Sequence, residues 1–81
     1  MSRVSVRLFG GAAEAFGEAE AEVDGVTTLT GLADALGEAD GRLREILEQC
    51  SFFVDGEHRK NLDATLPEEC RVDVLPPFAG G

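Results

Sequence analysis

With 81 residues, the chain can form one small domain with a single core, and it is too short for an active site enclosed between two lobes. Its 16 acidic residues outnumber 7 lysines and arginines, giving a formal net charge of -9 that argues against nucleic acid and anionic lipid as partners and favours a basic protein surface. The acidity also fits a high-salt host or a coding bias, and composition does not separate these readings.

The first predicted element is a half-buried strand over residues 3–9. Val4, Val6 and Leu8 alternate with other side chains and therefore point to one face. Phe9 falls out of step with them and is expected on the opposite face.

The next two predicted elements are short. Gly10 and Gly11 end the strand, and the alanine-rich residues 12–16 are expected to form one or two helical turns that stop at Gly17. Residues 18–23 predict a weaker strand, in which small apolar residues alternate with glutamates that face solvent and oppose edge-to-edge pairing.

Two helical stretches follow and should lie on the same side of the sheet. Thr28 or Thr30 is placed to cap the first. Its apolar residues have helical spacing and are Leu29, Leu32, Ala33 and Leu36. The second has apolar residues at three- and four-residue steps, namely Leu43, Ile46, Leu47 and Cys50.

The remaining residues predict two or three strands. Residues 52–54 form a strand that ends in an Asp-Gly turn, and the polar residues 57–69 leave room for one more short strand. Residues 71–75 form the last strand, with Val72 and Val74 facing the core.

This order of elements predicts an α+β roll. The first and last strands have the cleanest inward patterns, so we expect them side by side and parallel at the centre of a mixed sheet of four to five strands. One main helix should pack across it as a right-handed crossover. Residues 1–75 would form the domain and residues 76–81 an extended C-terminal tail.

The sequence ends in Leu75-Pro76-Pro77-Phe78-Ala79-Gly80-Gly81. Prolines fix φ and remove backbone donors, so they direct the chain out of the sheet along an extended path. Gly80 and Gly81 lack Cβ atoms, and the segment is therefore slim enough to enter a narrow channel. A frayed terminus is the alternative, which accounts for the glycines but not for the prolines.

A small sheet-and-helix domain with a Pro-Pro-x-x-Gly-Gly ending resembles the ubiquitin-like sulfur carriers of β-grasp fold. Residues 6–10 and Phe16-Gly17 are similar to that family's first strand and following short helix. The double proline looks most like the MoaD type, the small subunit of molybdopterin synthase. The Gly-Gly end alone is shared with ThiS-type thiazole carriers, cysteine-synthesis carriers and archaeal ubiquitin-like modifiers.

The resemblance implies chemistry at Gly81, next to Gly80. An α-carboxylate is ionised at neutral pH and is a poor acyl electrophile, so it needs activation. In the family, an E1-like enzyme adenylates the terminal glycine with ATP and magnesium, and a sulfur donor, a sulfurtransferase or cysteine desulfurase, converts it to a thiocarboxylate. In the MoaD case the large synthase subunit then uses the sulfur to build molybdopterin. The chain would be a carrier, not an enzyme, and would bind no cofactor or metal itself.

The resemblance leaves two alternatives open. Gly81 could instead be joined to lysines of target proteins, as in ubiquitin-like modifiers. The sulfur could also serve tRNA thiolation, thiazole synthesis or cysteine synthesis.

Phe9 and Leu75 are both out of register with the inward residues of their strands, so they share one outer surface if the strands are neighbours. An exposed apolar patch rimmed by charge is a candidate docking site. The residues expected to contact partners are Phe9, Leu75, Pro76, Pro77, Phe78 and Ala79. Packing of Phe9 in a satellite core is the alternative. Related carriers have apolar positions on this face, and His58 lies where another would be expected.

Cys50 and Cys70 have neither a CxxC spacing nor a histidine cluster beside them, so no zinc or redox motif is indicated. We expect buried, reduced thiols with a structural role, and persulfide handling is the alternative. No apolar run is long enough for a signal peptide or a membrane span, which predicts a cytoplasmic protein. The sequence has no nucleophilic triad, no paired carboxylates and no phosphate loop, so it does not indicate a stand-alone enzyme.

Overall fold

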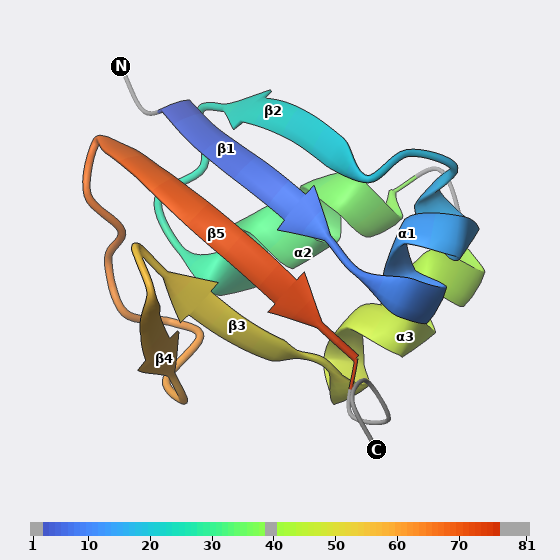
Figure 1. Cartoon of the computed structure of the whole chain (residues 1–81). Helices are drawn as coiled ribbons and strands as arrows, with labels where there is room; N and C mark the ends of the chain where they lie inside the picture. Colours follow the sequence, from blue (N-terminus) through green and yellow to red (C-terminus); the bar gives the residue numbers. More distant parts are fainter. Residues whose placement is uncertain (1–2, 39–40, 77–81) are drawn as a thin grey trace.

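The computed structural model describes residues 3–38 and 41–76. Within them, one mixed sheet has the strand order β2-β1-β5-β3-β4, with α2 and α3 across one face and α1 at the end where β1 finishes (Figure 1). The strands are β1 (Arg3–Leu8), β2 (Glu20–Asp24), β3 (Ser51–Val54), β4 (Glu57–Arg59) and β5 (Glu69–Leu75). The helices are α1 (Gly10–Phe16), α2 (Leu29–Gly37) and α3 (Gly41–Gln49).

The predicted parallel pairing of the first and last strands is confirmed. β1 and β5 lie side by side at the sheet centre, with Val6 opposite Val72 and Leu8 opposite Val74. β2 pairs antiparallel with β1, and β3 pairs antiparallel with both β5 and β4. Because β5 is both a central strand and the last one in the chain, the C-terminal residues follow directly from the sheet centre (Figure 1).

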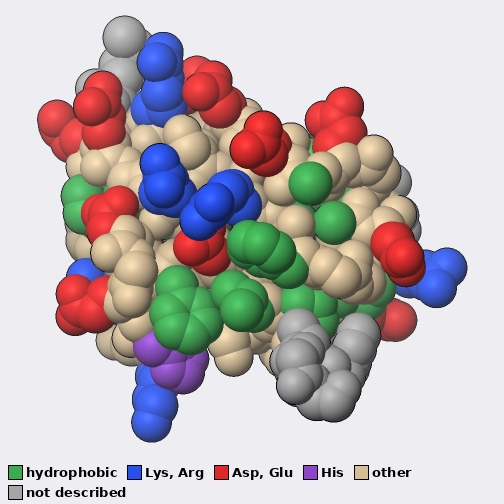
Figure 2. Space-filling view, viewed as in Figure 1, with side chains coloured by type: hydrophobic (Ala, Val, Ile, Leu, Met, Phe, Trp, Pro, Cys, Tyr) green, Lys and Arg blue, Asp and Glu red, His purple; other side chains and the backbone are tan. Residues whose placement is uncertain are grey.

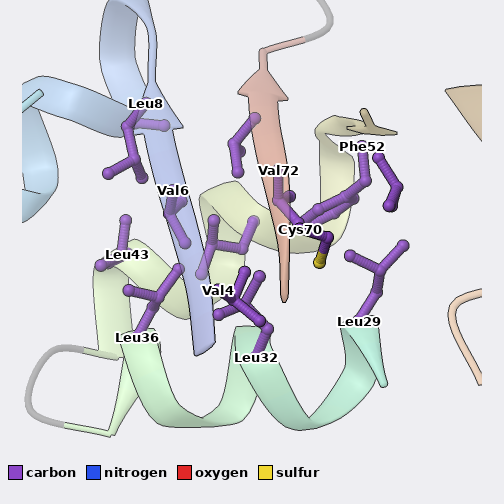
Figure 3. Close-up of a cluster of buried hydrophobic side chains, with 14 residues drawn as sticks. Val4, Val6, Leu8, Leu29, Leu32, Leu36, Leu43, Phe52, Cys70 and Val72 are labelled. Atoms are coloured by element: carbon purple, nitrogen blue, oxygen red, sulfur yellow. The ribbon is translucent and has the colours of Figure 1, made fainter. Parts of the chain in front are cut away.

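A single hydrophobic core fills the space between the sheet and the helices (Figure 3). Its largest fully buried side chains are Phe52, Leu29, Leu32, Leu43, Leu47, Val4, Val6, Val54, Val72 and Val74. Each such side chain stabilises the fold by about 1.5–3 kcal/mol through removal of apolar surface from water. No polar or charged side chain is buried among the described residues, so the core stabilises the fold by apolar packing.

Two contacts hold the helical layer in place. The Thr28 hydroxyl accepts a hydrogen bond from the Gly31 N–H at 3.0 Å and caps α2. At the C-terminal end of α2, a Cβ added at Gly37 would lie 3.1 Å from the Arg44 Cα of α3, so the close approach of the two helices requires glycine there. The Arg44 guanidinium also pairs with Asp34 of α2 at 2.6 Å.

Several boundaries differ from the sequence prediction. Of the two predicted caps, Thr28 is the one that forms, while the Thr30 hydroxyl donates to an Asp63 carboxylate oxygen at 2.7 Å and so joins α2 to the loop before β5. β2 begins at Glu20 and not at residue 18, because its pairing with β1 ends at Arg7. The helical layer is also larger than one main helix, since α2 and α3 have nine residues each.

None of the helices in the described residues combines the length and the apolar character that a membrane crossing requires.

Candidate docking face and tail exit

The sheet face opposite the helices is not covered by any element of the described chain (Figure 1). Hydrophobic side chains gather on this face beside the single histidine, with basic side chains next to them (Figure 2). We call the group formed by Phe9, Phe53 and Leu75 the apolar patch. It is built from the ends of the two central strands and from β3, so its backbone is held by the sheet.

The strand register brings the apolar patch together. Leu75 pairs with Ser51 at the start of β3, and Phe53 lies two residues further along that strand on the same face. Phe9 follows directly after the pair of Leu8 and Val74, and its N–H donates to the Val74 carbonyl oxygen at 3.2 Å. These contacts place Phe9 beside Leu75, as the alternation predicted.

Phe9 is the exposed large hydrophobic residue of the described chain, with 39% of its surface accessible. It lies outside the core cluster, which argues against the satellite core that was its alternative. Leu75 and Phe53 are half-buried. That any of them contacts a partner stays a prediction.

Phe53 and His58 complete this surface and were not among the predicted contact residues. They pair across β3 and β4, and their rings stack with centroids 4.9 Å apart and planes 26° apart. The signal for Phe53 was in the sequence, because a residue between two inward-facing neighbours, Phe52 and Val54, must face outward. The ring of His58 extends the apolar patch towards the sheet edge.

A charged pair borders the apolar patch. Arg7 on β1 donates from Nε and Nη2 to the two carboxylate oxygens of Asp73 on β5, at 3.0 and 3.3 Å. This hydrogen-bonded pairing, and then the negative charge of Asp73, raise the pKa of Arg7. The Arg7 Cζ also lies 5.8 Å from the centre of the Phe9 ring, within cation–π distance. Both carboxylate oxygens of Asp73 thus accept hydrogen bonds from Arg7, and the Arg7 guanidinium lies against the Phe9 ring.

Pro76 is the last described residue, and it is buried. It packs against the corner between β1 and α1, where Gly10 has φ of +55° and a Cβ would lie 3.4 Å from the Pro76 Cγ. The part of the predicted tail that the structure describes thus rests on the domain. Pro77, Phe78, Ala79, Gly80 and Gly81 lie outside the described residues, so their predicted roles, and the division into 1–75 and 76–81, stay predictions.

Both cysteines are free thiols. Cys70 belongs to the core, while Cys50 is half-buried and its Sγ donates to the Ile46 carbonyl oxygen at 3.1 Å. Burial raises the pKa of both thiols, and the negative charge of Asp55 adds to the effect on Cys70. A raised pKa disfavours the thiolate, the form that handles sulfur as a nucleophile, so this environment fits a structural role.

The chain matches known proteins over nearly its whole length. The profile of the ThiS family matches residues 6–81. The fold superposes on small archaeal modifier protein 1 (SAMP1) from Methanosarcina acetivorans with a TM-score of 0.82 and 20% identity, over 100% of this chain and 98% of that chain. It superposes equally, at 0.82 and 18% identity, on the putative molybdopterin converting factor, subunit 1, from Pyrococcus furiosus, over 95% and 99% of the two chains.

A third structure is similar in sequence as well. It is the protein–protein complex of subunits 1 and 2 of the molybdopterin-converting factor from Helicobacter pylori, with 29% identity and a TM-score of 0.72 over 98% of this chain and 99% of that chain. No curated protein matches the chain. The family match and the shared topology agree with the predicted β-grasp fold, and the chain belongs to the ThiS family of ubiquitin-like sulfur carriers.

Proposed function

We propose that the chain is the small subunit of a cytoplasmic molybdopterin synthase, and that Gly81 carries the sulfur as a thiocarboxylate. The observation that carries this proposal is the family match, which runs through Gly81. The 29% identity to a chain from a molybdopterin-converting factor complex favours molybdopterin over the other sulfur pathways. The Pro-Pro-x-x-Gly-Gly ending supports the same choice.

The chemistry belongs to the partners. In an E1-like enzyme, a carboxylate oxygen of Gly81 attacks the α-phosphorus of ATP with magnesium present, and pyrophosphate leaves. The acyl adenylate is an electrophile that the free carboxylate is not, and a sulfur donor then displaces AMP. In the large synthase subunit, the sulfur is transferred to the pterin precursor of molybdopterin, and Gly81 returns to a carboxylate. This chain supplies the acyl group and the docking surface, and it is a co-substrate and not a catalyst.

The domain contributes by limiting where the reacting group can go. Pro76 is held against the corner at Gly10, and five residues, 77–81, separate it from the reacting carboxylate. Five residues reach at most roughly 17 Å, at about 3.3–3.6 Å per residue. A partner docked on the apolar patch must therefore place its reactive site within that distance of Pro76.

Reconstitution tests the proposal. The chain, its E1-like enzyme, ATP and magnesium should give an acyl adenylate that hydroxylamine traps at Gly81. Addition of a sulfur donor, the large subunit and the sulfur-free pterin precursor should give molybdopterin. A chain that lacks Gly81 is the control, and it should give neither product. Formation of the adenylate and the thiocarboxylate without any molybdopterin would contradict the molybdopterin assignment.

Protein modification is the second candidate. The fold match to SAMP1, named as a small archaeal modifier protein, favours it, although 20% identity reports the fold alone. In this case the adenylated Gly81 would be transferred to lysine amino groups of target proteins. Tryptic peptides that carry residues 72–81 on a lysine, left after cleavage at Arg71 and lost in the chain without Gly81, would support this function.

A further inference from the structure

Arg71 occupies a central place on the open face of the sheet. It lies on β5 directly opposite Ser5 of β1, whose small side chain leaves the space above it free. The guanidinium borders two shallow hollows, of about 700 and 450 Å³, that meet at Ser5 and Arg7. Basic side chains are visible there next to the apolar patch (Figure 2).

Unlike its neighbours, Arg71 has no ion pair with any described residue. Arg3 on the same face pairs with Asp24 at 3.8 Å, and Arg7 forms its two hydrogen bonds with Asp73. The Asp55 carboxylate lies close by but accepts from the backbone N–H of Arg71, at 2.9 Å. The carboxylates of Asp24, Asp55 and Asp73 are thus engaged elsewhere.

The remaining acidic side chains of this face lie around its margin. Glu20 and Glu22 stand on the edge strand β2, opposite Arg7 and Ser5, and Glu69 stands at the start of β5. All three are exposed. Charges at the margin of an interface stay hydrated and contribute little, whereas charges at its centre lose their water.

A partner that covers the apolar patch also reaches Arg71. Phe53 pairs with Asp73, which lies on the same face of β5 only two residues from Arg71. A guanidinium that is removed from water without a counter-ion destabilises the complex strongly, while one that meets a carboxylate forms a strong bidentate contact. The partner must supply that carboxylate, because the described chain does not.

We propose that the large synthase subunit presents an aspartate or glutamate side chain to Arg71 when it docks on the apolar patch. This inference rests on the proposed function and adds a recognition group to it. Net charge alone predicted a basic partner surface. The net charge of -9 still attracts such a surface at long range, but the centre of the docking face would bind an acidic side chain.

The test compares two variants that remove one positive charge each. Arg71→Gln removes it from the open face, and Arg44→Gln removes it from α3 on the helical side. The affinity of each variant for the large synthase subunit of the same organism is measured together with association and dissociation rates. Arg71→Gln should bind about 10- to 100-fold more weakly, mainly through faster dissociation, because a desolvated charged contact is lost. Arg44→Gln should change the affinity less than about threefold.

Salt and charge reversal sharpen the result. The loss in Arg71→Gln should persist at about 0.5 M salt, where exposed charges are screened and long-range attraction is removed. Arg71→Glu should be rescued at least tenfold when one acidic residue of the large subunit is changed to arginine.

The outcomes separate this inference from the proposed function. If the unaltered chain does not bind the large subunit, the proposed function fails and this inference falls with it. If the unaltered chain binds and Arg71→Gln binds equally well, only the contact at Arg71 is overturned. A loss seen with the E1-like enzyme but not with the large subunit would also overturn it, because the acidic group would belong to another partner.

Discussion

Replacement of Phe9 by alanine should weaken docking of the large synthase subunit about 30-fold and leave the domain folded. Phe9 exposes 39% of its surface. A phenylalanine side chain presents on the order of 200 Å² in all, so docking can remove roughly 80 Å² of it from water. At about 25 cal/mol per Å² this is about 2 kcal/mol of binding free energy, which corresponds to about a 30-fold change in affinity.

Isothermal titration of the large subunit measures the affinity, and thermal unfolding measures the stability of the variant alone. Phe9→Ala should lose about 1 kcal/mol of folding stability or less, because Phe9 lies outside the core cluster. Phe52→Leu is the control, since Phe52 has 2% exposure and faces the core. It should lower stability by roughly 1 kcal/mol and leave the affinity unchanged.

Unchanged binding of Phe9→Ala would refute the reasoning, because the exposed ring would then lie outside the contact. A large drop in stability with a proportional drop in binding would refute it differently, by showing that Phe9 supports the core and does not dock.

The other predictions concern stability and the thiols. Thr28→Ala should lower the free energy of unfolding by about 1 kcal/mol in urea denaturation, because the N–H of Gly31 loses its cap; an unchanged midpoint would contradict that role. Gly37→Ala should lower the melting temperature by several degrees, corresponding to about 1–3 kcal/mol, because its Cβ would press on the backbone of Arg44; full stability in this variant would show that the helices can separate at no cost. Alkylation of Cys50 should be slower than that of a cysteine in a short unstructured peptide at pH 8, because the pKa of Cys50 is raised and less thiolate is present. The raised pKa also predicts how stability depends on pH. The protonated Cys50 thiol contributes its full stabilisation below the ordinary cysteine pKa, and this contribution is lost as the pH rises through the raised value. The free energy of unfolding should therefore fall in alkali, and it should fall less in Cys50→Ala.

Alternation along single strands was sufficient to predict the centre of the fold. Val6 and Val72 each lie in a strand whose valines and leucines alternate with outward-facing residues, and this pattern predicted both their burial and the parallel pairing of the two strands. The same rule put Phe9 and Leu75 on the opposite face. It applied equally to Phe53, which was missed because a three-residue apolar run reads first as core.

Contacts that depend on the register between distant segments were not predictable. Arg7 and Asp73 are 66 residues apart, and nothing local marks them as partners. The packing of Pro76 against Gly10 depends on the left-handed turn at the end of β1, which a Gly-Gly pair permits but does not specify. Likewise, the sequence alone does not show that the Arg71 guanidinium has no ion pair within residues 3–38 and 41–76, because this depends on where Asp55 and Asp73 are engaged.

The mass of the intact protein isolated from its own cells tests the central claim most directly. A thiocarboxylate at Gly81 replaces one oxygen by sulfur, so the account predicts a species roughly 16 Da heavier than the unmodified chain. That species should disappear when Gly81 is deleted, with the melting temperature nearly unchanged. Finding the unmodified carboxylate together with adducts linked to lysine, and no heavier species, would contradict the sulfur-carrier function and favour protein modification.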